Sequence, residues 1–236
     1  MVSASLLLSL SFFALFSSSQ SQSQSHSKVS LELYYESLCP DCSKFIVNHL
    51  SKIFKDDLIT IVDLKLVPWG NAIFRHNDTF YCQHGPYECF LNTVEACAIN
   101  IWPQPNKHFP FIYCVEDLAK QGKPEEWKSC FEKLHLDSKP ITQCYKSEYG
   151  KKLELKYAAE TSALRPPHTY VPWVVVDGTP LNEDFQNFIS YVCKAYKGSD
   201  PPHSCTKAAD LGEVNAKPKH SVCYMERGVS TREQVI

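Results

Sequence analysis

Apolar residues recur at every second position where the folded part of the chain begins. Within VSLELYYES these residues are Val29, Leu31, Leu33 and Tyr35. This period of two predicts a strand. In the next stretch, CPDCSKFIVNHLSKIF, apolar residues follow the spacing of one helix face, and Pro40 lies near the first turn, where its missing N–H is tolerated. The pattern therefore predicts a strand that leads directly into a helix.

A second apolar run, DLITIVDLKLVPWG, predicts another strand, which Pro68 and Gly70 end. Strand, helix and strand form one β-α-β unit, and the crossover rule favours a parallel pair. Residues 29–70 are therefore expected to be the first part of an α/β domain. Residues 71–165 differ, because they hold six cysteines and their periodicity predicts helices near 87–101, 110–121, 124–136 and 139–163. We expect an inserted helical subdomain with several disulfides there.

The α/β pattern returns in residues 166–197. The run YVPWVVVDG predicts a buried strand that ends in the tight turn pair Asp177-Gly178. A short strand, TPLN, and a helix, EDFQNFISYVCKAY, complete this part. Residues 198–236 show little periodicity and are expected to form a loosely ordered tail, although they contain Cys205 and Cys223.

The first residues carry a targeting pattern. An apolar run from about Leu6 to Phe16 is followed by small and polar residues, and it is shorter than the roughly 20 apolar residues that span a bilayer. Residues 1–24 are predicted to be a secretory signal peptide with a flexible lead, and a buried helix is the alternative. The expected location is the secretory pathway, ending in a lysosome, a vacuole or the extracellular space.

Composition and charge narrow the function classes. The 236 residues are 44% hydrophobic, which is enough for a substantial core. The 24 basic residues against 26 acidic residues give no net field that would attract nucleic acid or an anionic membrane, so neither is expected as a partner. Eleven cysteines fit an oxidising compartment, and the sequon at Asn77 would accept a glycan there.

The C-x-x-C pair, Cys39 and Cys42, lies at the predicted junction of strand and helix. A thiolate at Cys39 would face the unpaired N–H groups of the helix N-terminus, and Cys42 would lie one turn later. This arrangement predicts a redox-active pair in which Cys39 attacks and Cys42 resolves. A permanent small-loop disulfide and half of a zinc site are the alternatives, but a zinc site needs a second such pair, which the sequence lacks.

A third pattern lies in CQHGPYECFLNTVEAC. It matches C-Q-H-G-x-x-E-C-x-x-N-x-x-x-x-C at Cys82, Gln83, His84, Gly85, Glu88, Cys89, Asn92 and Cys97. Over residues 29–196 the chain thereby resembles the gamma-interferon-inducible lysosomal thiol reductase family. The resemblance implies a thioredoxin-like fold with an inserted disulfide-rich helical subdomain. It also implies a reductase that cleaves protein disulfides at acidic pH, without a metal or another cofactor.

The thioredoxin architecture gives Pro172 a place beside the dithiol. In that architecture a cis-proline precedes the strand that faces the cysteines, and Pro172 lies at the matching position. A cis bond would bring the Val171 backbone beside the cysteines, where it could pair with a substrate strand. An ordinary trans proline that opens a strand is the alternative.

The signature residues have two readings. The three signature cysteines and His84 could form a metal cluster, but disulfides are favoured in a chain so rich in cysteine. The polar residues of the signature are expected to fix a turn and a helix start, because Gly85-Pro86 is a turn signal. Whether His84 or Glu88 also contacts the dithiol is left open.

The predicted partners are disulfide-containing protein substrates and a small thiol that restores the dithiol. The same chemistry can run as a disulfide oxidase or isomerase, and a non-catalytic disulfide-rich binding module is a further alternative. Asp41, two residues after Cys39, would raise the pKa of the Cys39 thiol when it is ionised. Nine cysteines remain beside the redox pair, an odd number. Cys205 and Cys223 are therefore expected either to leave with the tail or to link two chains in a disulfide-bonded dimer.

Overall fold

The computed structural model of the chain describes residues 28–75, 78–210 and 221–225, and of residues 207–210 the backbone alone. The predicted signal peptide and the sequon residue Asn77 lie outside these ranges. Within the described residues, no helix is both long and apolar enough to cross a bilayer.

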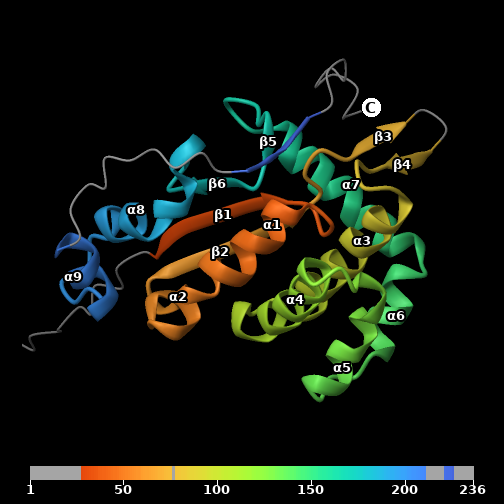
Figure 1. The fold of residues 1–236 in the computed structure, drawn as a ribbon, viewed down its shortest axis with the longest axis horizontal. Helices are drawn as coiled ribbons and strands as arrows, with labels where there is room; N and C mark the ends of the chain where they lie inside the picture. Colours follow the sequence, from red (N-terminus) through yellow and green to blue (C-terminus); the bar gives the residue numbers. More distant parts are fainter. Residues whose placement is uncertain (1–27, 76–77, 211–220, 226–236) are drawn as a thin grey trace, which may run out of the picture.

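A four-stranded sheet forms the centre of the α/β part (Figure 1). Its strands are β1 (Val29–Tyr35), β2 (Val62–Pro68), β6 (Trp173–Val176) and β7 (Thr179–Pro180), in the order β2-β1-β6-β7. Strands β1 and β2 are parallel, which confirms the predicted β-α-β unit, whereas the other two pairs are antiparallel. The predicted hairpin turn at Asp177-Gly178 is also confirmed, because both residues have positive φ angles between β6 and β7.

The crossover from β1 to β2 begins with α1 (Pro40–Phe45). It continues through a π-helical turn (Ile46–Leu50), α2 (Lys52–Lys55) and a 3-10 turn (Leu58–Thr60). This last turn replaces the start of the predicted second strand, because Asp57 has a left-handed backbone and the strand begins only at Val62. The ring of Phe45 packs against Phe185 and Phe188, at the start of α8 (Phe188–Ala195). The first and last helices of the α/β part therefore pack against each other.

The inserted subdomain begins with a hairpin that the sequence pattern did not predict, β3 (Ile73–Arg75) and β4 (Thr79–Tyr81). Its helical elements follow: α3 (Pro86–Ile101), α4 (Pro105–Lys120), a 3-10 turn (Pro124–Lys128), α5 (Ser129–Lys133), α6 (Lys139–Tyr145) and α7 (Glu148–Ser162). In Figure 1 they form a lobe beside the sheet.

Three predicted helices of the insertion differ from the observed ones. In place of the helix predicted over 124–136, the chain forms a 3-10 turn and then α5, which ends at Lys133. Helix α4 starts at Pro105 rather than near residue 110, because the Gln104 carbonyl already accepts hydrogen bonds from Lys107 and His108. The single long helix predicted over 139–163 is wrong. Ser147 has an extended backbone and its hydroxyl accepts a hydrogen bond from the Tyr149 N–H at 3.2 Å, so that it caps a new helix.

Disulfides connect the helices of the insertion and the tail. Cys97–Cys144 joins α3 to α6, Cys114–Cys130 joins α4 to α5, and Cys82–Cys89 closes the loop before α3. Cys193–Cys205 joins α8 to α9 (His203–Asp210). The sulfurs of the signature cysteines are thus bonded to other cysteines, as the disulfide reading expected.

Of the C-terminal segment 198–236, the structure describes residues 198–210 and 221–225, and these contain regular elements that the sequence pattern did not predict. The segment contains α9 and a short strand, β8 (Cys223–Tyr224), which pairs antiparallel with β5 (Tyr170–Val171). Figure 1 shows β8 as the blue strand near β5. Both cysteines of this segment are bonded within the chain, Cys205 to Cys193 and Cys223 to Cys39. Short apolar periodicity could not reveal a segment that is fixed by disulfides.

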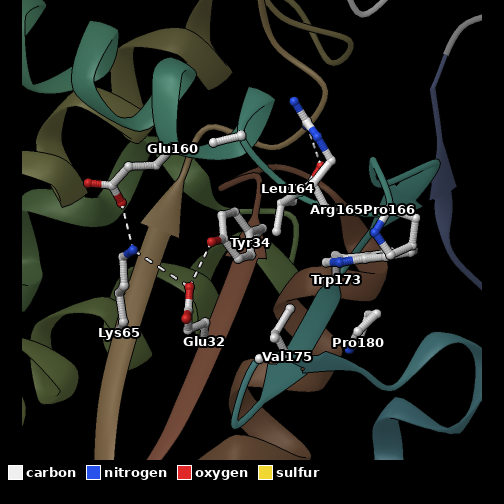
Figure 2. A pocket seen from close by; sticks show the side chains of 12 residues that line it. Glu32, Tyr34, Lys65, Glu160, Leu164, Arg165, Pro166, Trp173, Val175 and Pro180 are labelled. Carbon is white, nitrogen blue, oxygen red and sulfur yellow. Dashed lines mark hydrogen bonds and ion pairs between the residues drawn. The ribbon is translucent and has the colours of Figure 1, made fainter.

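One face of the sheet carries a hollow of about 300 Å³ (Figure 2). Lys65 lies at its side, where its Nζ is 3.0 Å from Glu160 and 3.6 Å from Glu32. The Tyr34 hydroxyl donates to Glu32 at 2.7 Å. Because side chains alternate along a strand, Glu32 and Tyr34 point away from the face that carries Tyr35. No cysteine lines this hollow.

Candidate redox site

Cys39 is the N-cap residue of α1. Its Sγ accepts a hydrogen bond from the Cys42 N–H at 3.4 Å. Its side chain is fully buried, between the end of β1 and the segment that carries β5. A sulfur at this position faces the positive end of the helix, which favours the thiolate over the thiol.

Cys42 lies one turn further along the chain, with a fully buried side chain. Among the cysteines that the structure describes, it is the one with a free thiol. Burial raises the pKa of this thiol well above its ordinary value, and the negative charge of Glu36 raises it further. Cys42 is therefore hard to ionise, whereas an attacking residue needs a readily formed thiolate.

Cys39 is bonded to Cys223 rather than to Cys42. The two bonded residues are 184 positions apart in the sequence, so no local spacing signals this pairing. The sequence pattern had instead placed Cys223 in a tail that leaves or links subunits. The observed bond keeps Cys39 covered and leaves the predicted partner, Cys42, reduced.

Pro172 lies beside this bond. The Val171–Pro172 peptide is cis, and the carbonyl oxygen of Val171 is 4.0 Å from the Sγ of Cys39. Val171 is also the last residue of β5, the strand that pairs with β8. The proline therefore lies at the face where the sulfur of Cys39 meets another chain segment.

Glu36 is a site residue that the sequence analysis missed. Its side chain is fully buried, and one carboxylate oxygen accepts from the Asn71 N–H at 2.5 Å. A carboxylate oxygen of Glu36 and the sulfurs of Cys39 and Cys223 lie within 4.8 Å of one another. Burial raises the pKa of Glu36 well above its ordinary value, and the charge of Glu88 adds to the effect. The signal in the sequence was an isolated acid between Tyr35 and Ser37, just before the C-x-x-C pair.

His84 and Glu88 of the signature connect this acid to solvent. The His84 Nδ1 forms a short hydrogen bond with Glu88 Oε2 and lies 3.8 Å from Glu36 Oε2. The hydrogen bond to Glu88 raises the pKa of His84. The His84 side chain is 32% exposed, whereas Glu36 and Glu88 are buried. The open question about His84 and Glu88 is thus answered: they reach the cysteines through Glu36.

Other signature residues hold the loop before Cys39. Asn92 accepts from the Ser37 N–H at 3.0 Å, and the Ser37 hydroxyl donates to the Glu88 carbonyl at 3.2 Å. Gly85 has a φ of +91°, a backbone conformation that favours glycine, and it precedes Pro86 at the start of α3. These contacts agree with the expected role in fixing a turn and a helix start.

Gln83 has a different role from the one expected. Its side-chain amide donates to the carbonyl of Tyr224 at 2.8 Å. The amide of Asn71 donates both to the Cys223 carbonyl at 3.0 Å and to Gln83 Oε1 at 2.7 Å. Gln83 and Asn71 therefore bind the backbone of β8, and neither contact could be read from the sequence, because β8 is more than 140 residues away.

Three buried carboxyl groups, on α3, α4 and α7, lie near one another. The Tyr35 hydroxyl donates to Glu95 at 2.6 Å, and the Ser43 hydroxyl donates to Glu116 at 2.5 Å. Burial raises the pKa of Glu95 to about 8, and it raises the pKa values of Glu116 and Glu154 well above their usual range. We call Glu95, Glu116 and Glu154 the acid layer.

Comparison with known proteins places this site in a family. Residues 30–134 match the family described as Gamma interferon inducible lysosomal thiol reductase (GILT). A protein of Arabidopsis thaliana named gamma-interferon-responsive lysosomal thiol protein is 44% identical over 208 residues, which cover 86% of this chain and 87% of that protein. The gamma-interferon-inducible lysosomal thiol reductase of Mus musculus is 37% identical over 201 residues, covering 83% and 76%.

Solved structures share the fold at low sequence identity. DsbA of Chlamydia trachomatis superposes with a TM-score of 0.52 at 17% identity and covers 70% of this chain and 85% of its own. The reduced form of the disulfide bond oxidoreductase DsbG from Mycobacterium tuberculosis gives a TM-score of 0.52 at 16% identity, covering 77% and 83%. The fold is thus thioredoxin-like, as predicted. The chain belongs to the gamma interferon inducible lysosomal thiol reductase family and is a thiol–disulfide oxidoreductase.

Proposed function

We propose that this enzyme reduces disulfide bonds of protein substrates, with Cys39 as the nucleophile and Cys42 as the resolving thiol. The observation that carries the proposal is the contrast between the two sulfurs. The Cys39 sulfur receives an N–H hydrogen bond at the start of α1 and is bonded to a cysteine on another strand. The Cys42 sulfur lies one turn further along α1 and is a free thiol.

The cycle has two exchange steps. The Cys39 thiolate attacks one sulfur of a substrate disulfide, forms a mixed disulfide and releases the other substrate sulfur as a thiolate. The Cys42 thiolate then attacks the Sγ of Cys39, which forms Cys39–Cys42 and releases the second substrate thiol. A small thiol returns the two electrons by reducing Cys39–Cys42, and it is itself oxidised to a disulfide.

An acidic compartment, such as a lysosome or a vacuole, sets a demand on Cys39. A thiol with a pKa of about 8.5 is only about 0.03% ionised near pH 5. A helix N-terminus contributes up to about 2 kcal/mol toward the anion, and the Cys42 N–H adds a direct hydrogen bond. This support makes attack by Cys39 at acidic pH feasible. In an extracellular location, less stabilisation of the Cys39 thiolate would be needed.

Glu36 supplies a proton acceptor in this proposal. Its carboxyl group is close to the sulfur of Cys39, and burial raises its pKa, which makes its carboxylate a stronger proton acceptor than an exposed one. His84, which is partly exposed and lies 3.8 Å from Glu36, can pass the proton to solvent. Glu36 thereby assists ionisation of the Cys39 thiol, which burial would otherwise keep neutral.

The test replaces Cys42 or Cys39, one at a time, in a protein that already carries Cys223→Ser. This background substitution removes the disulfide partner of Cys39. With Cys42→Ser, a disulfide-containing protein substrate should remain attached to Cys39 as a covalent complex on a non-reducing gel. With Cys39→Ser, no complex should form and reduction should stop. Equal residual activity in both variants would reject the assignment. Equilibration of Cys39–Cys42 with glutathione then separates a reductase from an oxidase or isomerase.

A further inference from the structure

The strand β8 lies where a thiol reductase needs its substrate. It pairs antiparallel with β5, with Cys223 opposite Val171 and Tyr224 opposite Tyr170. The Met225 N–H donates to the Thr169 carbonyl at 3.1 Å and extends the pairing by one bond. An extended segment is thus added to the edge strand that precedes Pro172, which is the geometry of β-strand addition by a peptide.

Two side chains bind backbone carbonyls of the same segment. Asn71 donates to the Cys223 carbonyl at 3.0 Å, and Gln83 donates to the Tyr224 carbonyl at 2.8 Å. The Asn71 amide also donates to Gln83 Oε1 at 2.7 Å, which connects the two side chains. The two contacts with the segment are to backbone carbonyls. They would form equally with any extended chain, whatever its side chains.

The side chain that follows the bonded cysteine is weakly held. Tyr224 is 68% exposed, with one edge-on ring contact to Tyr170 at 5.9 Å between centroids. Cys223, in contrast, is joined covalently to Cys39, and its carbonyl is bound by Asn71. The site therefore selects a cysteine in an extended backbone and tolerates variation at the next position.

We propose that β5, Asn71 and Gln83 form the binding site for extended cysteine-containing peptides, and that residues 221–225 fill this site as a tethered pseudosubstrate. The inference rests on the proposed function, in which Cys39 is the attacking residue. The bond between Cys39 and Cys223 then corresponds to the mixed disulfide with a substrate. It blocks the enzyme until the segment is released.

Release needs no external oxidant. The Cys42 thiolate attacks the Sγ of Cys39, the Cys39–Cys42 bond forms, the Cys39–Cys223 bond breaks, and Cys223 leaves as a thiolate that takes up a proton. Electrons are conserved in this exchange. A small thiol then reduces Cys39–Cys42 and is oxidised to its disulfide, which makes the free dithiol. Because the segment is part of the same chain, it competes with substrate at an effective concentration on the order of millimolar.

The first experiment compares the full-length, non-reduced chain with Cys223→Ser. We expect Cys39 in the unmodified chain to resist alkylation and substrate reduction to begin after a lag that added small thiol shortens. The Cys223→Ser variant should alkylate at Cys39 at once and show no lag. The same lag in both proteins would overturn the pseudosubstrate proposal and leave the reductase function intact. An alkylatable Cys39 without any reduction in the variant would instead overturn the proposed function.

The second experiment tests the backbone contacts. In the Cys223→Ser background, Gln83→Leu and Asn71→Ala should each weaken binding of an added SVCYM peptide about fivefold, since each loses one hydrogen bond. Tyr224→Ala, the matched control in the otherwise unmodified chain, should leave the lag unchanged because that side chain is exposed. Unchanged peptide affinity in both amide variants, or loss of the lag in Tyr224→Ala, would contradict backbone recognition. Circular dichroism verifies that each variant is folded.

Discussion

The two cysteines of the C-x-x-C pair lie three residues apart and are both fully buried, but the partners of their sulfurs differ. Cys39 receives an N–H hydrogen bond at the start of α1 and meets the C-terminal strand. Cys42 is enclosed, and burial together with the charge of Glu36 raises its pKa. The difference teaches that burial does not separate the two sulfurs, since both are fully buried. The proposed division into an attacking and a resolving sulfur rests instead on the start of α1, whose N–H groups face Cys39.

The largest expected effect tests this contrast directly. In reduced protein carrying Cys223→Ser, Cys39 should react with iodoacetamide much faster than Cys42, because burial and the charge of Glu36 raise the pKa of the Cys42 thiol, whereas the helix N-terminus favours the Cys39 thiolate. Mass spectrometry of the alkylated peptides measures both rates. Similar rates would remove the electrostatic basis for assigning the two roles.

A smaller effect is expected when Glu36 is changed. Glu36→Gln should slow formation of the mixed disulfide between Cys39 and substrate about tenfold or more at pH 5 to 6, because the Cys39 thiol loses the nearby proton acceptor. Quenched samples on non-reducing gels measure the rate of that step across pH. The same substitution at the exposed Glu132 is the control. If the rate depends on pH in the same way in Glu36→Gln and in Glu132→Gln, Glu36 has a structural role alone.

The acid layer is expected to affect the stability of the fold rather than the reactivity of the two cysteines. Glu95 binds a proton in the folded state up to a pKa of about 8, whereas an exposed carboxyl loses it near 4.5. The folded state therefore holds more protons between these values, and the stabilisation present below pH 4.5 is lost as pH rises. The free energy of unfolding should fall by up to about 1.4 kcal/mol per pH unit for this group.

Two buried histidines oppose this trend. Burial lowers the pKa of His168 to about 4 and also lowers that of His108, so their contribution is lost as pH falls below 6.5. Stability should therefore rise clearly from pH 8 to 6.5 and more gradually below it. Urea unfolding at each pH measures the curve. Glu95→Gln should flatten the upper part, and an unchanged slope would show that Glu95 is ionised in the folded protein.

The smallest effect concerns Asp41, which pairs with Lys44 at 3.3 Å. Asp41→Asn should raise the thiolate fraction of Cys39 about twofold, because a neighbouring negative charge is removed but Lys44 already offsets part of it. Lys44→Gln should change the fraction in the opposite direction. The pH dependence of Cys39 alkylation measures both, and a raised Cys39 pKa in Asp41→Asn would contradict the expectation.

Local patterns in the sequence were sufficient for much of the fold. The alternation in β1, the helix that follows Cys39 and the turn at Asp177-Gly178 depend on neighbouring residues, so periodicity reveals them. The C-x-x-C pair and the eight-residue signature were visible for the same reason. The break at Ser147 was missed because helical periodicity continues on both sides of it, and only the backbone shows where the cap lies.

Contacts between distant segments could not be predicted. Glu36 becomes a site residue because Asn71 and Cys223 are folded against it, and Gln83 because β8 lies beside it. The disulfide between Cys39 and Cys223 joins the start of the fold to its last described strand. Such pairs depend on the tertiary arrangement, and single residues give no sign of their partners.

The disulfide between Cys193 and Cys205 fixes the chain just before the final segment. A protease that cuts between Cys205 and Cys223 would therefore leave a two-chain molecule that runs as one species on a non-reducing gel. The small fragment would leave only when a thiol opens its bond to Cys39. Loss of that fragment would then record, molecule by molecule, in which copies of the enzyme Cys42 has displaced Cys223 from Cys39.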